Sequence, residues 1–140
     1  MSGKKNIGLK SILLSVGAGV LLSFGIATAF LVLETVLVLN ETISPSASAI
    51  VAIMVHIISA YVGCLLAGKR AKEAVTVATT GVLVVSILLH TVLSVLLMDA
   101  QLGHVLRVVL PEILGCVLAM LSLAGKGRNR KTRKVMKRYL

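Results

Sequence analysis

The sequence predicts an all-α, polytopic membrane protein: an antiparallel four-helix transmembrane bundle with both termini in the cytoplasm. The first observation is composition, because 57% of the 140 residues are hydrophobic and only 14% are charged. The second is that four apolar segments fill most of the chain, each with at least the about 20 residues that a helix needs to cross a bilayer. The third is that the positive charges lie almost entirely on one side of these segments.

The four spans are expected at about 11–38, 45–68, 74–98 and 105–125. They should be helices, because a bilayer requires each spanning segment to satisfy its own backbone polar groups. A transmembrane barrel would show segments of about 10 residues that alternate in polarity, and these segments do not alternate. We therefore expect a single four-helix membrane domain over 1–125 and a basic cytoplasmic tail over 126–140.

The first two spans have recognisable beginnings. Lys4 and Lys5 precede an apolar run that could be mistaken for a signal peptide, but the run exceeds the 7–15 residues of such a region, so we expect a retained span. In the second span Ser44 is a plausible N-cap, with Pro45 at the first helical position.

The third and fourth spans follow short turns at 69–73 and 99–104, and short connections favour antiparallel neighbours. Pro111 in the fourth span cannot donate a hydrogen bond to the carbonyl of Arg107, which predicts a kink there. The alternative is a span that starts near Pro111, but it would leave only 15 residues up to Gly125.

Charge gives the orientation. Of the 15 Lys and Arg residues, all except Arg107 precede the first span, lie between the second and third, or follow the fourth. The positive-inside rule therefore predicts that both termini and the 69–73 turn are cytoplasmic.

Small residues recur on one face of each span, where they would let helix backbones approach in lipid. The packing residues that we predict are Gly19, Ser23, Gly63, Ala67, Gly115 and Ala119. Segments 63–67 and 115–119 share the pattern Gly-Cys-x-Leu-Ala, a weak sign of an internal repeat. The two cysteines, Cys64 and Cys116, lie in apolar segments and are expected to be packing residues.

Ionisable residues inside apolar segments are costly and by default indicate function. The candidate intramembrane polar site consists of Glu34, His56, His90 and Glu112. His90 and Glu112 fall at similar depths, so we expect them to share a hydrogen bond, whereas His56 should lie nearer the midplane and Glu34 near the outer interface. Two interpretations stay open: a proton- or cation-linked site, or polar contacts that only join helices, with Glu34 reaching headgroups.

No nucleophile–base pair, cofactor motif or metal-ligand spacing is present in the sequence, which predicts no enzyme activity, no cofactor and no metal. The tail should contact an anionic inner leaflet. Nucleic acid is not an expected partner, because Tyr139 is the only aromatic residue of the tail. The apolar spans are also compatible with another membrane protein or a second copy of the chain as a partner. The predicted lipid-contacting residues are Lys126, Arg128, Arg130, Lys131, Arg133, Lys134, Lys137 and Arg138.

Segment 61–72 (YVGCLLAGKRAK) and segment 113–119 (ILGCVLA), which precedes the basic tail, resemble the YrzE-like family. The resemblance implies a small four-span protein in the plasma membrane of a Gram-positive bacterium. The family's function is unknown, so no functional residue is transferred. The chain also resembles small multidrug resistance transporters, which likewise have four short helices and a membrane carboxylate. It departs from them in the position of Glu34 at the outer end of its span, in having no Trp, and in its single charge-fixed orientation.

Two functional hypotheses follow. The one that the pattern favours is an accessory or structural membrane subunit that acts through helix packing and a basic cytoplasmic tail. The other is a small proton- or cation-linked transporter with a buried Glu/His pair.

Overall fold

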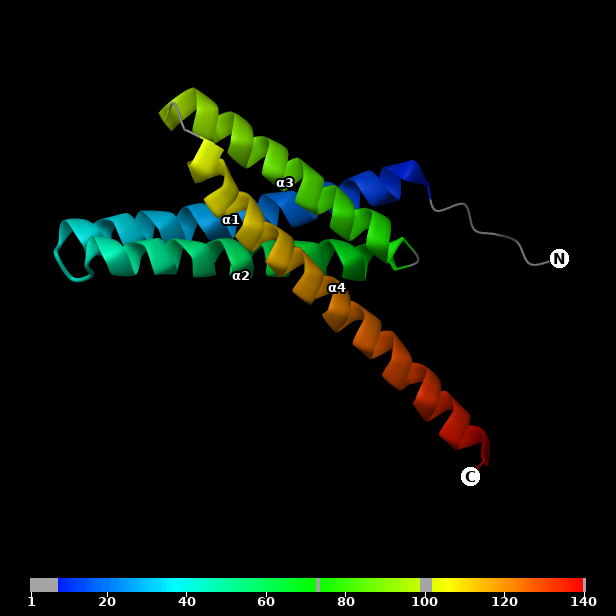
Figure 1. The fold of residues 1–140 in the computed structure, drawn as a ribbon. Coiled ribbons are helices and arrows are strands. Elements are labelled where there is room, and N and C mark those ends of the chain that lie inside the picture. The colour runs from blue at the N-terminus through cyan, green and yellow to red at the C-terminus, as the bar shows by residue number, and fades with distance from the viewer. Residues whose placement is uncertain (1–7, 73, 99–101, 140) are drawn as a thin grey trace.

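The computed structural model describes residues 8–72, 74–98 and 102–139, without the side chains of 94, 97–98, 102–104 and 126–139. It consists of four helices: α1 (Leu9–Leu39), α2 (Pro45–Ala71), α3 (Val75–Met98) and α4 (Leu102–Tyr139) (Figure 1). Each contains a segment long and apolar enough to cross a membrane. The predicted all-α class with four candidate spans is confirmed.

The helix ends follow local chemistry. The Ser44 side chain accepts a hydrogen bond from the Ala47 N–H at 3.3 Å, and Pro45 occupies the first turn of α2, as predicted. Glu41 and Lys72, which follow α1 and α2, have positive φ values of 55° and 47°. Such a backbone conformation reverses the chain within a few residues, which keeps the connections short.

Helix α4 begins at Leu102 and contains Pro111 in its interior. The alternative start of the fourth span near Pro111 is therefore wrong. The helix also continues through the basic segment to Tyr139, so residues 126–139 are helical and continuous with the apolar part of α4. At 1.5 Å per residue, α4 is about 57 Å long, well beyond the hydrocarbon thickness of a bilayer.

Helices α2 and α3 occupy the centre of the bundle. They contact each other, and each also contacts both α1 and α4. Within the described part of the chain, α1 and α4 do not contact each other. Figure 1 shows α1 and α2 side by side, whereas α4 crosses α2 obliquely and its basic half extends away from the other helices.

Most of the bundle surface is apolar. In the most apolar 18-residue stretch of each helix, only 22–33% of the residues are buried inside the bundle. Leucines such as Leu21, Leu96 and Leu121 are largely exposed. The interior is built from small residues, among them Ala67, Ala78 and Ala119. An apolar exterior around a small-residue interior is the pattern expected of helices that pack in lipid.

The predicted packing residues lie at the closest helix contacts, and all six are buried. A Cβ built on Gly19 would lie 2.7 Å from the Gly63 carbonyl oxygen, and one built on Gly63 would lie 2.6 Å from the Gly19 carbonyl oxygen. A Cβ on Gly115 would collide with the Ile57 carbonyl oxygen of α2. Glycine is therefore required where α1 and α4 approach α2.

Candidate functional site

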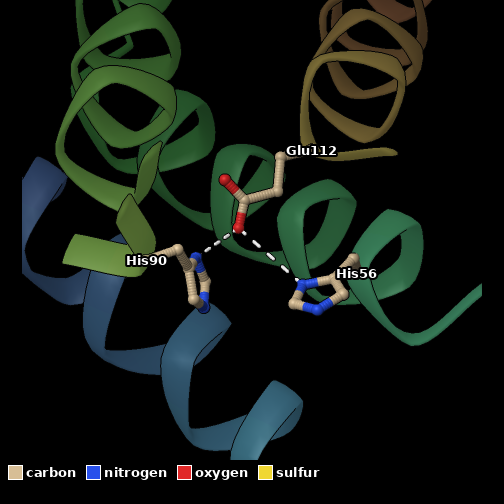
Figure 2. Close-up of side chains that lie close together, drawn as sticks. All are labelled: His56, His90 and Glu112. Carbon is tan, nitrogen blue, oxygen red and sulfur yellow. Dashed lines mark ion pairs between the residues drawn. The ribbon is translucent and has the colours of Figure 1, made fainter. Parts of the chain in front are cut away.

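Three ionisable side chains meet at the centre of the bundle. His56 comes from α2, His90 from α3 and Glu112 from α4, and Figure 2 shows both imidazole rings turned toward the Glu112 carboxylate. The close α2–α4 approach at Gly115, one turn after Glu112, holds the carboxylate against α2. The site therefore depends on the packing of three separate helices.

The distances identify one carboxylate oxygen as the common point. His90 Nδ1 lies 2.5 Å from Glu112 Oε1, and His56 Nδ1 lies 3.9 Å from the same oxygen. The predicted contact between His90 and Glu112 is confirmed as an ion pair, whereas the predicted hydrogen bond is not among those of the described residues. His56, which was expected nearer the midplane, also belongs to the cluster. We call these three residues the His56–His90–Glu112 triad.

The triad is buried, and its side chains approach one another as ion pairs without making hydrogen bonds among the described residues. Glu112 is 1% exposed, and the His56 and His90 side chains are 9% and 15% exposed. Both Nδ1 atoms and both Glu112 oxygens lack a hydrogen-bond partner among the described residues. A buried unpaired polar group costs roughly 1–3 kcal/mol, and a charged one more. A cation among these atoms would remove that cost.

Packing fixes the two imidazole rings. The His56 and His90 rings meet edge to face with centroids 5.3 Å apart, and Phe24 of α1 stacks on the His90 ring at 5.2 Å and 24°. Sequence reasoning missed Phe24. The one available signal was that Phe24 follows Ser23, a predicted packing residue of α1. That position does not predict a contact between Phe24 and the third span.

Glu34 does not join the triad. It is 7% exposed and accepts a hydrogen bond from Ser48 of α2. The carboxylate is buried between α1 and α2, so Glu34 forms a polar contact that joins these two helices. Ser48 is the partner that sequence reasoning did not identify.

The two cysteines also lie against one carbonyl group, outside the triad. Both are buried and free, and both thiols donate to the Thr79 carbonyl oxygen, Cys64 at 3.7 Å and Cys116 at 3.6 Å. The matching positions of 63–67 and 115–119 thus place both thiols against the same carbonyl group of α3. This arrangement agrees with a packing role for both thiols.

Chemically, the triad can bind a positive ion. One ligand atom from each residue lies within 4.8 Å of the others, and two imidazoles with one carboxylate form a donor set that suits metal ions such as Zn²⁺. The sequence prediction of no metal site rested on the absence of local ligand spacing. Here the three donors lie far apart in the chain and only the fold brings them together.

The comparisons with known proteins add no family. No family model, no curated protein and no solved structure matches the chain. The resemblance to the YrzE-like family therefore stays a prediction. The predicted lipid contacts of the basic segment also stay a prediction, because the side chains of 126–140 lie outside the described residues.

Proposed function

We propose that this chain is a small cation-linked membrane transporter whose working residues are His56, His90 and Glu112. The observation that carries the proposal is the set of buried nitrogen and oxygen atoms that converge from three helices as ion pairs but make no hydrogen bond among the described residues. Purely structural polar contacts between helices would be expected to satisfy their donors and acceptors. Ionisable residues in the membrane interior are rare, and those that line ion and proton pathways share this placement inside a bundle.

The proposal includes an orientation. Both termini and the turn between α2 and α3 are cytoplasmic, neighbouring helices are antiparallel, and the host membrane is a bacterial plasma membrane. The distribution of basic residues supports it, because Arg107 alone would lie on the outer side. Figure 1 adds support, since the α1–α2 turn and the α2–α3 turn lie at opposite ends of the bundle.

Transport can be tested in sealed vesicles that contain the purified protein, a pH indicator and a metal-ion indicator. An inside-negative potential is imposed, and proton and divalent-ion uptake are recorded separately. We expect uptake of at least one cation above that of protein-free vesicles. Glu112→Gln should abolish it, because the variant loses the negative charge at nearly unchanged size.

Glu34→Gln is the matched control, since it changes another buried carboxylate, which lies outside the triad; its Oε1 accepts a hydrogen bond from Ser48, and its Oε2 has no partner among the described residues. It should retain uptake. Vesicles that stay as tight as protein-free ones to both protons and metal ions would overturn the proposal. Equal losses in the two variants would mean that uptake reports on folding and not on the triad.

A second candidate, an accessory subunit, is favoured by one observation. The basic half of α4 extends away from the other helices, where it is accessible to another protein or to anionic lipid (Figure 1). Purification in mild detergent of the full chain and of a version ending at Gly125 would test this role. A defined partner that remains with the full chain and is lost from the shortened one would support it.

A further inference from the structure

We infer that the cation bound at the His56–His90–Glu112 triad is a first-row divalent transition-metal ion of the Zn²⁺ type. This inference rests on the proposed function and names its substrate class. It depends on four features of the site: the donor atoms, their separations, their number and their surroundings.

The donor atoms exclude the hard cations. Mg²⁺ and Ca²⁺ prefer shells of six or more oxygen atoms, whereas this site offers two imidazole nitrogens and one carboxylate. Imidazole is a preferred ligand of Zn²⁺, Cu²⁺, Ni²⁺ and Fe²⁺. A proton shared by the closest pair, His90 Nδ1 and Glu112 Oε1 at 2.5 Å, would leave His56 Nδ1 without a partner, whereas a metal ion would use all three residues.

The separations are close to those of a metal site. Bonds of about 2.0–2.2 Å in tetrahedral geometry place ligand atoms about 3.3–3.5 Å apart. The carboxylate oxygen Oε1 lies 2.5 Å from His90 Nδ1 and 3.9 Å from His56 Nδ1, so its distances fall on either side of this value. A shift of Oε1 by under about 1 Å, away from His90 and toward His56, would bring both distances into the range.

The number of ligands points to an exchangeable ion. Structural zinc sites are closed by four protein ligands, whereas three protein ligands leave a fourth position open. Cys64 and Cys116 do not belong to the group of ligand atoms around Glu112, so sulfur does not complete the shell within the described residues. An open position lets water or a departing ligand reach the ion, which a transported ion requires.

The surroundings hold the ligands in place. Phe24 stacks on the His90 ring, the two imidazoles pack edge to face, and Gly115 keeps α4 close to α2. The Glu112 carboxylate also supplies one negative charge, which lowers the cost of a divalent ion in a medium of low dielectric constant. The two imidazole ligands therefore have packing partners before the ion arrives, and the α2–α4 approach keeps the helix of Glu112 beside them.

Equilibrium binding to the purified full-length protein tests the inference. The protein is prepared without a histidine tag, stripped with a chelator, and titrated with Co²⁺, which gives strong visible absorption when four-coordinate, and then with Zn²⁺ in competition. We expect one ion per chain and displacement of Co²⁺ by Zn²⁺. Mg²⁺ and Ca²⁺ should not compete.

Glu112→Gln and His56→Asn should each weaken binding by roughly 100-fold or more, because loss of even an outer-shell partner costs 10–100-fold. Glu34→Gln should bind as the unaltered protein does. X-ray absorption at the zinc edge of the unaltered protein is the second measurement, and it does not depend on how the variants fold. It should show nitrogen and oxygen neighbours, including imidazole, and no sulfur.

The outcomes separate this inference from the proposed function. Proton uptake that depends on Glu112 without any metal binding would overturn the metal assignment and leave the transporter proposal standing. One bound Zn²⁺ per chain in vesicles that stay tight would overturn transport and leave a static metal centre. Sulfur neighbours would move the metal to Cys64 and Cys116 and overturn the triad as its site.

Discussion

At the scale of single residues, Glu112 is the residue on which the centre of the bundle depends. It is a carboxylate with 1% exposure, and one of its oxygens faces imidazoles from two other helices. Replacing a buried ion pair as a whole can be nearly neutral, whereas removing one partner leaves an uncompensated buried charge. We therefore expect the losses in unfolding free energy caused by mutating Glu112 and His90 to be strongly non-additive.

His90→Ala is expected to lower the free energy of unfolding by about 3–5 kcal/mol, because Glu112 would retain only His56, at 3.9 Å. Glu112→Gln in the same chain should restore much of that loss, since the neutral amide needs no counter-charge. Steric trapping in bicelles measures both variants and completes a double-mutant cycle with Glu112→Gln alone. Additive losses would mean that the two side chains do not interact energetically.

The sequence identified all three of these side chains as candidates but could not assemble the triad. Depth along each span predicted that His90 and Glu112 would meet, and they do. The place of His56 depended on how far α2 is shifted along its axis relative to α3 and α4. That shift is set by contacts such as Gly115 against Ile57, which no periodicity within one span reveals.

At the scale of elements, helix packing follows the small residues that the sequence makes visible. Gly19 of α1 and Gly63 of α2 approach each other so closely that neither has room for a Cβ. The extent of α4 was less predictable. The change from apolar to basic residues near Gly125 predicts a membrane boundary, but good helix formers such as Lys and Arg allow the helix to continue.

Gly19→Leu should destabilise the bundle by roughly 1–3 kcal/mol, because the side chain must separate α1 from α2. Gly17→Leu is the matched control on the same helix: Gly17 is exposed, and a Cβ at this position would meet no neighbouring group within 4 Å. It should change the stability by less than about 0.5 kcal/mol. Unfolding in detergent or by steric trapping compares the two. Equal effects would mean that the Gly19 face is not a packing interface.

At the scale of the whole molecule, the charge distribution predicts the orientation in the membrane, whereas the packing contacts determine how the helices are arranged. The basic residues predict which side of the membrane each end faces, and they do so independently of how the helices pack. The arrangement with α2 and α3 in the centre was not predictable from the sequence, because short loops bring neighbours in the chain together but leave open whether α1 packs beside α4; here α1 contacts α3 and α4 contacts α2.

Alkaline phosphatase fused after residue 140 should be inactive, and the same reporter inserted near Ser46 should be active, because the enzyme works only after export. A fluorescent protein that matures only in the cytoplasm should give the opposite pattern. These results are expected because all basic residues except Arg107 would otherwise have to cross an energised membrane. An active phosphatase at the C-terminus would reverse the orientation and place the basic half of α4 outside.

The order of the triad along the chain has a consequence for biogenesis. His56, His90 and Glu112 lie on α2, α3 and α4, so the ribosome completes both imidazole-bearing helices before the carboxylate is made. At about 5–20 residues per second, the 22 residues from His90 to Glu112 take roughly 1–4 s. When the carboxylate leaves the translocation machinery, its partners have already been synthesised. Because both histidines are made first, the time during which Glu112 faces lipid without its partners is as short as this order of helices permits.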